Sequence, residues 1–499
     1  MKKPLLLGYD IGSSSIKASL INADTGELVA AASSPDTEMK IDSPVNGWAE
    51  QHPETWWQHV VISTKKMLKN LTANSFEVLG IGISYQMHGL VLVNKQLEVI
   101  YPSIIWCDSR AVQIGNSAFR DLGQEHCLKN YLNSPGNFTA SKLKWVKENK
   151  PDVYESIYKI MLPGDYIALK LTNEAATTIS GLSEGIFWDF NSKKIAYTLI
   201  EHYNLNKNYL ADIVPTFGIQ GKLTAKAASE LGLTQGIPIA YRAGDQPNNA
   251  FSLNVLERGE VAATAGTSGV IYGVSDKNIF DTENRVNTFA HVNYSKDKPN
   301  VGVLLCINGT GIQYSWLKNI VFNNRYSYKE LNEMGEQVEI GCRGLMCFPF
   351  GNGAERVLKN AELQAALMGI NFNIHDQRHL IRAVQEGIVF AFRYGLDVMK
   401  SIGMEFSIVK VGNTNLFQSK LFKDAFVNTC NINLEIFNTD GSQGAARGAG
   451  IGVGIFSENT AFRSLKMIER LSPEKDLANK YDDIFNIWKK KLINELENK

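Results

Sequence analysis

Apolar and polar residues alternate in short blocks along the first 110 positions, and this pattern predicts a strand-rich opening. Short, mostly apolar runs lie at positions 5–9, 16–21, 28–32, 78–84, 90–93 and 104–106. Turns built from Gly, Ser, Asp and Thr separate the first three runs. Apolar runs that end at such small turn residues are typical of β-strands joined by tight hairpins.

Residues 53–71 carry their apolar side chains at helical spacing instead. Those that fall on one helical face are Trp57, Val60, Val61, Met67, Leu68 and Leu71. Pro53 suits the first position of a helix, where its missing N–H costs nothing. The stretch is therefore predicted to be an amphipathic helix lying between strands.

The second half of the chain repeats this theme in a weaker form. An apolar run at 260–265, a small-residue turn at 266–269 and a second run at 270–274 predict another hairpin. A long stretch at 376–402 has helical periodicity, and a strand-like run follows at 408–411. A strand, a small-residue turn and a strand in each half suggest two duplicated α/β domains.

No Pro- or Ser-rich linker separates the halves, so the boundary between them is placed from the motifs, near residues 252–258. The expected domains are residues 1–252 and residues 253–499. The second domain ends in a tail, from about residue 469, that is rich in Lys and Glu. This composition predicts a solvated surface helix, which is commoner than a helix that binds a partner.

Length, charge and cysteine usage narrow the class of protein. A chain of 499 residues exceeds the size at which single cores stop growing, which favours two domains. Lys plus Arg equals Asp plus Glu, at 51 each, so the chain has no overall charge that would attract nucleic acid or an anionic membrane. No apolar run is long enough to span a bilayer, and the six cysteines form no C-x-x-C pair. We expect a soluble cytoplasmic protein.

The turn that follows the first strand could hold phosphate. Its sequence, Asp10-Ile-Gly12-Ser13-Ser14, offers backbone N–H groups and hydroxyls that no bulky side chain covers. Asp10, at the strand end, would supply an oxygen ligand to a metal bound to that phosphate. The alternative is an ordinary β-turn with a solvated Asp. The turn is not a Walker A loop, because the Gly-x4-Gly-Lys pattern is missing. The turn at Gly266-Thr267 offers the same chemistry, and two such hairpins together favour a phosphate site shared between the domains.

Asp245 is the candidate general base. It follows the mostly apolar run 237–240 and Gly244, which frees the backbone at that point. A carboxylate beside a hydroxyl nucleophile can take its proton during phosphoryl transfer. The alternative is that Asp245 caps a helix beginning near Pro247, which is the commoner role of such an Asp.

Taken together, the motifs of this chain resemble the FGGY family of carbohydrate kinases from about residue 5 to residue 455. The matching motifs, in order, are Asp10-x-Gly-Ser-Ser, Gly244-Asp245-Gln246, Ala265-Gly-Thr-Ser, Ile307-Asn-Gly-Thr-Gly with Trp316-Leu317, Phe348-Pro349 with Glu355-Arg356, and Gly441-Ser-x-Gly-Ala-Ala. Each motif alone is common, whereas the set in this order is specific. Within the family, Gln86-Met87-His88-Gly89 and Trp106-Cys-Asp-Ser-Arg110 are most similar to the xylulokinases.

The resemblance implies two actin-like, ribonuclease-H-type α/β domains that flank a catalytic cleft. It implies ATP as phosphoryl donor with Mg²⁺, which Asp10 and Asp245 would bind. The nucleotide would contact residues of both hairpins and of two later loops, namely Ser13, Ser14, Lys17, Gly266, Thr267, Gly309, Gln313, Gly412 and Asn413. The sugar would lie deeper, against Gln86, Met87, His88, Trp106 and Asp245.

Two departures leave parts of this interpretation open. The family's adenosine loop is usually a run of glycines, whereas this chain has Gly412-Asn-Thr-Asn415. The catalytic loop continues as Gln246-Pro-Asn-Asn249, where many xylulokinases have small residues. Other sugars, such as ribulose, fuculose or gluconate, and an ATP-driven switch like actin remain alternatives, and so does a homodimer. The pairing of Asp245 with Met87-His88 argues for a sugar kinase, because a conformational ATPase needs no sugar pocket.

Overall fold

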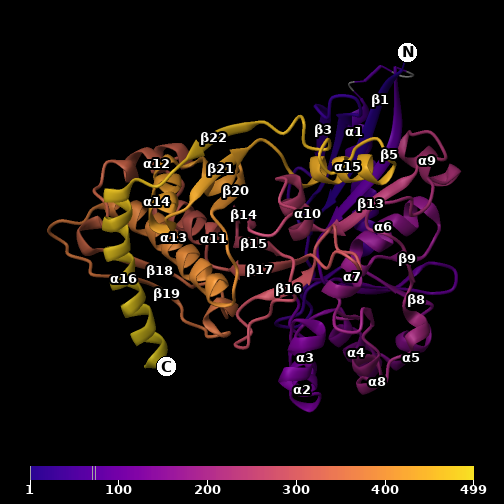
Figure 1. The fold of residues 1–499 in the computed structure, drawn as a ribbon, viewed down its shortest axis with the longest axis horizontal. Helices are drawn as coiled ribbons and strands as arrows, with labels where there is room; N and C mark the ends of the chain where they lie inside the picture. The colour runs from indigo at the N-terminus through magenta and orange to yellow at the C-terminus, as the bar shows by residue number, and fades with distance from the viewer. Residues whose placement is uncertain (1, 70, 73–74, 499) are drawn as a thin grey trace.

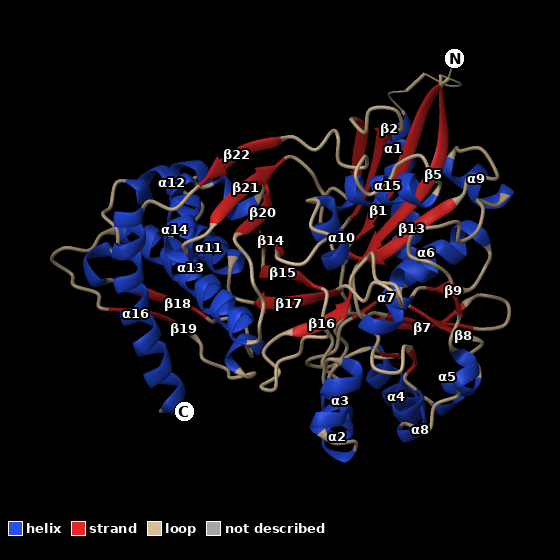
Figure 2. Ribbon diagram, in the orientation of Figure 1, coloured by secondary structure: helices blue, strands red, loops and turns tan. Residues whose placement is uncertain are grey.

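The computed structural model describes residues 2–69, 71–72 and 75–498. Two large β-sheets, each with its own helices, make up the molecule (Figures 1 and 2). The first sheet has the order β13 (Ile239–Gly244), β5 (Phe76–Tyr85), β1 (Lys3–Ile11), β2 (Ile16–Asn22) and β3 (Leu28–Ser34). The second has the order β16 (Asn287–Ala290), β17 (Val301–Ile307), β15 (Gly269–Ser275), β14 (Glu260–Ala265), β20 (Ile408–Gly412), β21 (Asn433–Phe437) and β22 (Met467–Leu471).

The helices and smaller sheets surround these two sheets. A four-stranded sheet in the first half has the order β4 (Glu50–Gln51), β7 (Val99–Ile104), β6 (Leu90–Val93) and β8 (Lys159–Met161). Two-stranded pairs are formed by β9 (Ala176–Thr177) with β12 (Asp212–Ile213), β10 (Trp188–Asp189) with β11 (Lys194–Ile195), and β18 (Met346–Pro349) with β19 (Ala365–Met368). The helices of the first half are α1 (Pro53–Leu68), α2 (Val112–Asp121), α3 (Gln124–Tyr131), α4 (Thr139–Asn149), α5 (Pro151–Glu155), α6 (Pro163–Thr172), α7 (Ile179–Glu184), α8 (Tyr197–His202), α9 (Ala225–Leu231) and α10 (Asp245–Ser252). Those of the second half are α11 (Gly311–Trp316), α12 (Tyr328–Glu336), α13 (Gln377–Ser401), α14 (Lys420–Cys430), α15 (Gly441–Gly452) and α16 (Lys475–Glu497).

The two large sheets repeat one strand plan, as the hairpin pattern predicted. In the first, β1 pairs antiparallel with β2 and parallel with β5, and β5 pairs parallel with β13. In the second, β14 pairs antiparallel with β15 and parallel with β20, and β20 pairs parallel with β21. The duplicated α/β architecture read from the sequence is therefore present.

Two helices cross between the halves. The late helix α15 packs on β1, β5 and β13 of the first sheet, and Figure 1 shows it in yellow among the indigo strands. Glycines permit this approach, because a Cβ at Gly8 or at Gly82 would stand 2.0 Å from a backbone oxygen of α15. The earlier helix α10 contacts α15 and also reaches β14 and β15 of the second sheet. The boundary at residue 252 separates the chain in sequence, whereas the packing interleaves the halves.

Two local predictions need correction. The strand expected at 104–106 ends at Ile104, because residues 105–108 form a turn closed by the Asp108 N–H and the Ile105 carbonyl at 3.2 Å. The Lys- and Glu-rich tail does form a helix, α16, but not one that merely lies in solvent. Trp488 on its inner face is fully buried and donates from Nε1 to the Cys347 carbonyl at 2.8 Å. Within the described residues, no helix is both long and apolar enough to cross a membrane.

Candidate active site

Three neighbouring parallel strands of the first sheet end at one edge, and each presents predicted site residues there. The register pairs Asp10 of β1 with Ser84 of β5, and Ser84 with Ala243 of β13. β5 runs directly into residues 86–88, and β13 runs into Asp245. The carboxyl ends of adjacent parallel strands are the usual ligand-binding edge of α/β sheets. The topology thus brings together groups that are up to 235 positions apart in the chain.

Asp10 is held at this edge by a neighbouring hydroxyl. Ser84 Oγ donates to Asp10 Oδ1 at 2.9 Å. Burial raises the pKa of Asp10, the nearby cation of Lys17 lowers it, and the carboxylate of Asp440 raises it further. Lys17 lies opposite Asp10 in the β1–β2 ladder. Burial is therefore the main cost to the charged form of this carboxylate, and a bound cation would offset that cost.

Asp245 is the first residue of α10, directly after Gly244. Burial raises its pKa to about 7, and the negative charge of Asp10 contributes to the same shift. A carboxylate with a pKa near the working pH can both accept and release a proton, which is the property a general base needs. The alternative that Asp245 caps a helix beginning near Pro247 is wrong, because the helix begins at Asp245 itself, with Gly244 as N-cap and no side-chain cap hydrogen bond. The catalytic role stays a prediction.

His88 is a neutral ring with a defined tautomer. Burial lowers its pKa to about 3, and the cation of Lys142 adds to that shift. The ring Nδ1 lies 3.0 Å from the Glu184 carbonyl oxygen, which can only accept, so Nδ1 carries the proton. Nε2 is then left as an acceptor. Phe138 and Phe289 flank the ring, with centroid distances of 4.8 and 5.2 Å.

The other predicted sugar-side residues lie around this ring. Met87 is buried against Gly244, where a Cβ would stand 2.6 Å from Met87 Cγ, so the sugar segment and the catalytic loop touch. Gln86 is buried as well, and its Nε2 approaches Gln51 Oε1 at 3.5 Å. Trp106 is half exposed and donates from Nε1 to Ser13 Oγ at 3.3 Å.

That contact links the sugar side to the first hairpin. The Gly12 N–H donates to the Ser15 carbonyl at 3.1 Å and closes the turn, with Ser14 inside it and Lys17 in the strand that follows. Gln51 Nε2 donates to the Ser13 carbonyl at 2.8 Å and so helps to hold the turn in place. The hairpin has the small, hydroxyl-bearing tip that a phosphate site requires.

A cavity of about 710 Å³ opens beside the second hairpin. The turn is tied to the start of α11, because the N–H groups of Gly311 and Ile312 donate to the carbonyls of Gly266 and Thr267 at 2.9 and 3.0 Å. The cavity is lined by Ala265, Gly266, Thr267, Gly311, Ile312, Tyr314, Ser315, Tyr328, Lys329, Asn332, Glu333, Glu336, Asn415, Leu416, Gln418 and Lys420. Its size suits a nucleotide, since ligand cavities usually measure about 300–1,000 Å³.

Of the nine predicted nucleotide contacts, Gly266 and Thr267 line this cavity and the other seven lie outside its wall, as far as the described residues define it. Ser13, Ser14 and Lys17 belong to the first hairpin, and the remaining four come from later loops. Gln313 donates from Nε2 to Cys347 Sγ at 2.9 Å, and the Gly309 N–H donates to Glu355 Oε1 at 3.2 Å. Gly412 ends β20, and the Asn413 N–H donates to the Phe437 carbonyl at 2.9 Å. Their direct contact with nucleotide stays a prediction.

Sequence reasoning missed the groups that later elements bring to both sites. Tyr328 and Asn332 on α12 line the cavity but belong to no recognisable motif. The capping box of Ser327 and Glu330 marks the start of that helix, although it says nothing of a ligand. Phe289 comes from β16 of the second half, and only the folded arrangement places it against His88.

Comparison with known proteins assigns the family. Residues 5–252 match the FGGY family of carbohydrate kinases, N-terminal domain. A xylulose kinase of Staphylococcus xylosus is 27% identical over 488 residues, covering 97% of this chain and 99% of that protein. The crystal structure of a "xyloylose kinase" from Brucella ovis superposes with a TM-score of 0.87 at 25% identity, covering 97% and 98% of the two chains. A gluconate kinase from Lactobacillus acidophilus has a TM-score of 0.89 at 19% identity, covering 99% of each chain, and shares the fold.

These matches extend along nearly the whole chain and agree with the duplicated sheets. The predicted pair of actin-like domains is confirmed by the fold that the sugar kinases share with this chain. The chain belongs to the FGGY family of carbohydrate kinases.

Proposed function

We propose that this enzyme transfers the γ-phosphoryl group of ATP to a hydroxyl of D-xylulose, giving D-xylulose 5-phosphate and ADP. The observation that carries the proposal is the meeting of Asp245, whose pKa is about 7, with His88 at the ends of adjacent strands. The xylulose kinase of Staphylococcus xylosus, which aligns over nearly the full length, supports the choice of sugar.

Asp245 acts as the general base of the transfer. As the sugar oxygen attacks phosphorus, its proton passes to the Asp245 carboxylate, the new O–P bond forms, and the bond to the ADP oxygen breaks. Little covalent chemistry falls to the protein in such a transfer, which depends on positioning and on charge. A base with a pKa of about 7 can then return the proton to solvent after the product leaves.

Asp10 and Asp245 together would hold Mg²⁺. Two partly exposed carboxylates, one of which raises the pKa of the other, fit a divalent cation, and Mg²⁺ usually takes one or two carboxylates with phosphate oxygens. When bound, the ion would neutralise charge on the transferring phosphoryl group. Ser13, Ser14 and Lys17 on one side, with Gly266 and Thr267 on the other, are assigned to the phosphates.

His88 sets a condition on the sugar. Because its Nε2 is an acceptor, the sugar must present a hydroxyl that donates to it. A site built for such a bond rejects analogues that lack the group, because its own polar atom is then left without a partner. Met87 and Trp106 provide apolar surface for the carbon face.

The proposal includes a cytoplasmic setting, where ATP is available. All six cysteines are free thiols, which agrees with a reducing compartment. Homodimer formation remains part of the prediction, and sugar and ATP are the partners that the site accounts for.

A coupled ADP-release assay across ketoses, polyols and aldonates tests the function. D-Xylulose is expected to give the highest kcat/KM, and ribulose, fuculose, gluconate and glycerol lower values. If gluconate or glycerol outperforms every pentulose, the sugar assignment is wrong. If no sugar accelerates ADP release over the rate with water alone, the enzyme is an ATP-driven switch instead.

A further inference from the structure

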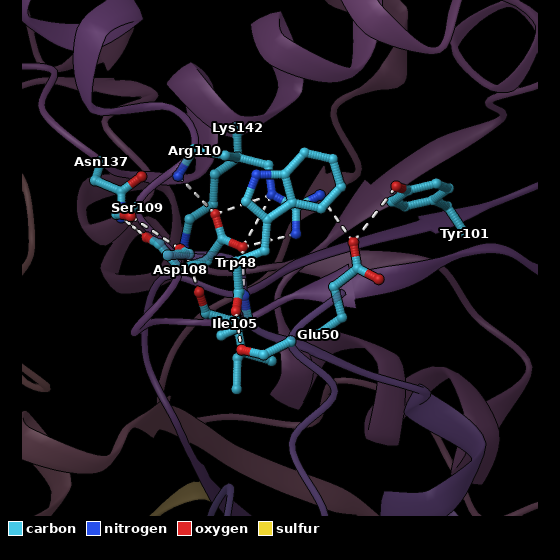
Figure 3. Close-up of polar contacts among 12 residues, drawn as sticks. Trp48, Glu50, Tyr101, Ile105, Asp108, Ser109, Arg110, Asn137 and Lys142 are labelled. Atoms are coloured by element: carbon cyan, nitrogen blue, oxygen red, sulfur yellow. Dashed lines mark hydrogen bonds and ion pairs between the residues drawn. The ribbon is translucent and has the colours of Figure 1, made fainter. Parts of the chain in front are cut away.

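One buried ammonium joins the two segments that form the proposed sugar site. Lys142, on α4, is fully buried, and its Nζ donates to the His88 carbonyl at 3.0 Å and to the Ile105 carbonyl at 2.9 Å. His88 follows β5, and Ile105 follows β7, so the bonds connect the ends of strands in different sheets. Figure 3 shows Lys142 beside Ile105, Asp108 and Arg110.

The first of these bonds supports an unusual backbone. His88 has a φ of +61°, in the left-handed region that residues with a Cβ seldom adopt and that persists only where the surroundings impose it. Two donors converge on its carbonyl, because Thr139 Oγ1 lies 3.2 Å from the same oxygen. The ring is held from the other side by the Glu184 carbonyl. Lys142 therefore helps to fix the orientation in which Nε2 is presented.

The second bond fixes the segment that carries Trp106. Ile105 immediately precedes Trp106, whose Nε1 contacts Ser13 in the phosphate hairpin. Four residues after Trp106, Arg110 binds both oxygens of Asp108 through Nε, at 3.0 and 2.9 Å, and reaches Glu50 at 2.8 Å. Lys142 holds one end of this segment and Arg110 holds the other.

The neighbouring acid does not bind Lys142 directly. Asp108 accepts from the Ala49 N–H at 2.6 Å and from the guanidinium of Arg110, which lies 3.8 Å from the ring centroid of Trp48. Burial lowers the pKa of Lys142 to about 7, and the charge of Asp108 opposes that shift. Burying an ammonium group costs free energy, and this one donates its bonds to two backbone carbonyls. The segments that those carbonyls position explain why the group is there.

We propose that Lys142 is a positioning residue for sugar binding, which fixes His88 and Trp106 by holding the carbonyls of His88 and Ile105. The inference rests on the proposed sugar site. It goes beyond the residues that touch the substrate, because Lys142 lies under the site and acts through the backbone of two segments.

Lys142→Met tests it, since methionine keeps much of the aliphatic volume and removes the ammonium. Losing two bonds to buried carbonyls is expected to raise KM for D-xylulose by roughly 2- to 10-fold, comparable with His88→Ala, with KM for ATP changed less than about twofold. Lys159→Met is the matched control, because Lys159 Nζ also donates to two carbonyls, those of Asn208 at 2.9 Å and Leu210 at 2.7 Å. That variant should leave both KM values unchanged.

A double-mutant cycle separates positioning from general destabilisation. If Lys142 acts through His88, adding Lys142→Met to His88→Ala should raise KM much less than it does in the wild type. Fully additive effects, or an equal rise in both KM values, would overturn the inference. Thr139→Val removes the second donor to the His88 carbonyl without touching a charge. Should Lys142→Met fail to fold, this variant must still raise KM for xylulose, by roughly 2- to 5-fold.

The two proposals fail in different ways. If the wild type shows no sugar-dependent ADP release, the proposed function is wrong. If the wild type phosphorylates xylulose while Lys142→Met keeps its KM, only the positioning role is wrong.

Discussion

The two halves of the molecule share one strand plan and differ in what stands at the strand ends. In the first half, the matched parallel strands β1, β5 and β13 lead to Asp10, His88 and Asp245. In the second half, the matched strands β14 and β20 end near Thr264 and Asn413. Acids and an imidazole suit proton transfer and metal binding, whereas hydroxyl and amide groups suit an uncharged base and ribose. Under the proposed function, one scaffold provides two chemistries through a few terminal side chains.

The third strand of the second half, β21, is an exception, because an acid follows it. After β21, Asp440 caps α15, where its Oδ1 accepts from the Gln443 N–H at 3.0 Å and from Ser442 Oγ at 2.8 Å. Its charge faces the first half and raises the pKa of Asp10. This acid of the second half therefore acts on the chemistry of the first.

Neutralising the proposed general base should have the largest effect on the division of chemistry between the two halves. Asp245→Asn is expected to lower kcat by roughly 10²- to 10⁴-fold, the span for losing a general base, while ATP binding stays nearly intact. Because the folded-state pKa of Asp245 lies above its unfolded value, the ionised carboxylate destabilises the fold as pH rises through about 4 to 7. The variant should therefore also melt at a higher temperature than the wild type at pH 8. Wild-type turnover in Asp245→Asn would refute the role.

Removing the other acid should give a different phenotype. Asp10→Ala is expected to lower kcat by roughly 10- to 100-fold and to raise the Mg²⁺ concentration needed for half-maximal rate, so that excess Mg²⁺ restores part of the activity. A magnesium titration of the steady-state rate measures this. An unchanged magnesium dependence would mean that the metal lies elsewhere.

A reciprocal pair of variants tests whether the halves divide the substrates. His88→Ala should raise KM for xylulose by roughly 2- to 10-fold, because it loses one neutral hydrogen bond, and should leave KM for ATP unchanged. Tyr328→Ala, in the wall of the large cavity, should raise KM for ATP by a similar factor and spare the sugar. Two variants that each affect both substrates equally would contradict the division.

The smallest expected effect is a shift in pH dependence. With a base of pKa about 7, kcat/KM of the wild type should fall as pH drops below 7, because the carboxylate becomes protonated. Asp10→Asn removes a negative charge that raises this pKa, so the acid limb should move to lower pH, by roughly 0.5 to 1 unit. A limb that stays in place in Asp10→Asn would show that the two acids are not coupled.

The sequence could predict features that depend on neighbouring residues, but not those that depend on contacts between distant segments. The hairpins at Gly12 and Gly266 depend on local turn chemistry, so both were readable, and so was the strand before Asp245. The meeting of the strand ends depends on sheet order, which only the family resemblance supplied. Phe289 and Tyr328 come from elements with no motif, and their places are set by tertiary packing. The crossing of α15 into the first sheet leaves no local trace except small residues, which also occur in ordinary helices.

That crossing has a consequence for any attempt to divide the protein. A fragment that ends at residue 252 would keep β1, β5 and β13 but lose α15, and the groove at Gly8 and Gly82 would face water. Expressed alone, such a fragment should aggregate, because the surface that α15 covers would be exposed. It would do so although it contains the acids and the imidazole of the proposed sugar site. Supplying residues 253–499 as a separate chain should rescue it, because α15 can then fill the groove from outside. Split at this point, the kinase should behave as two complementing pieces rather than as two independent modules.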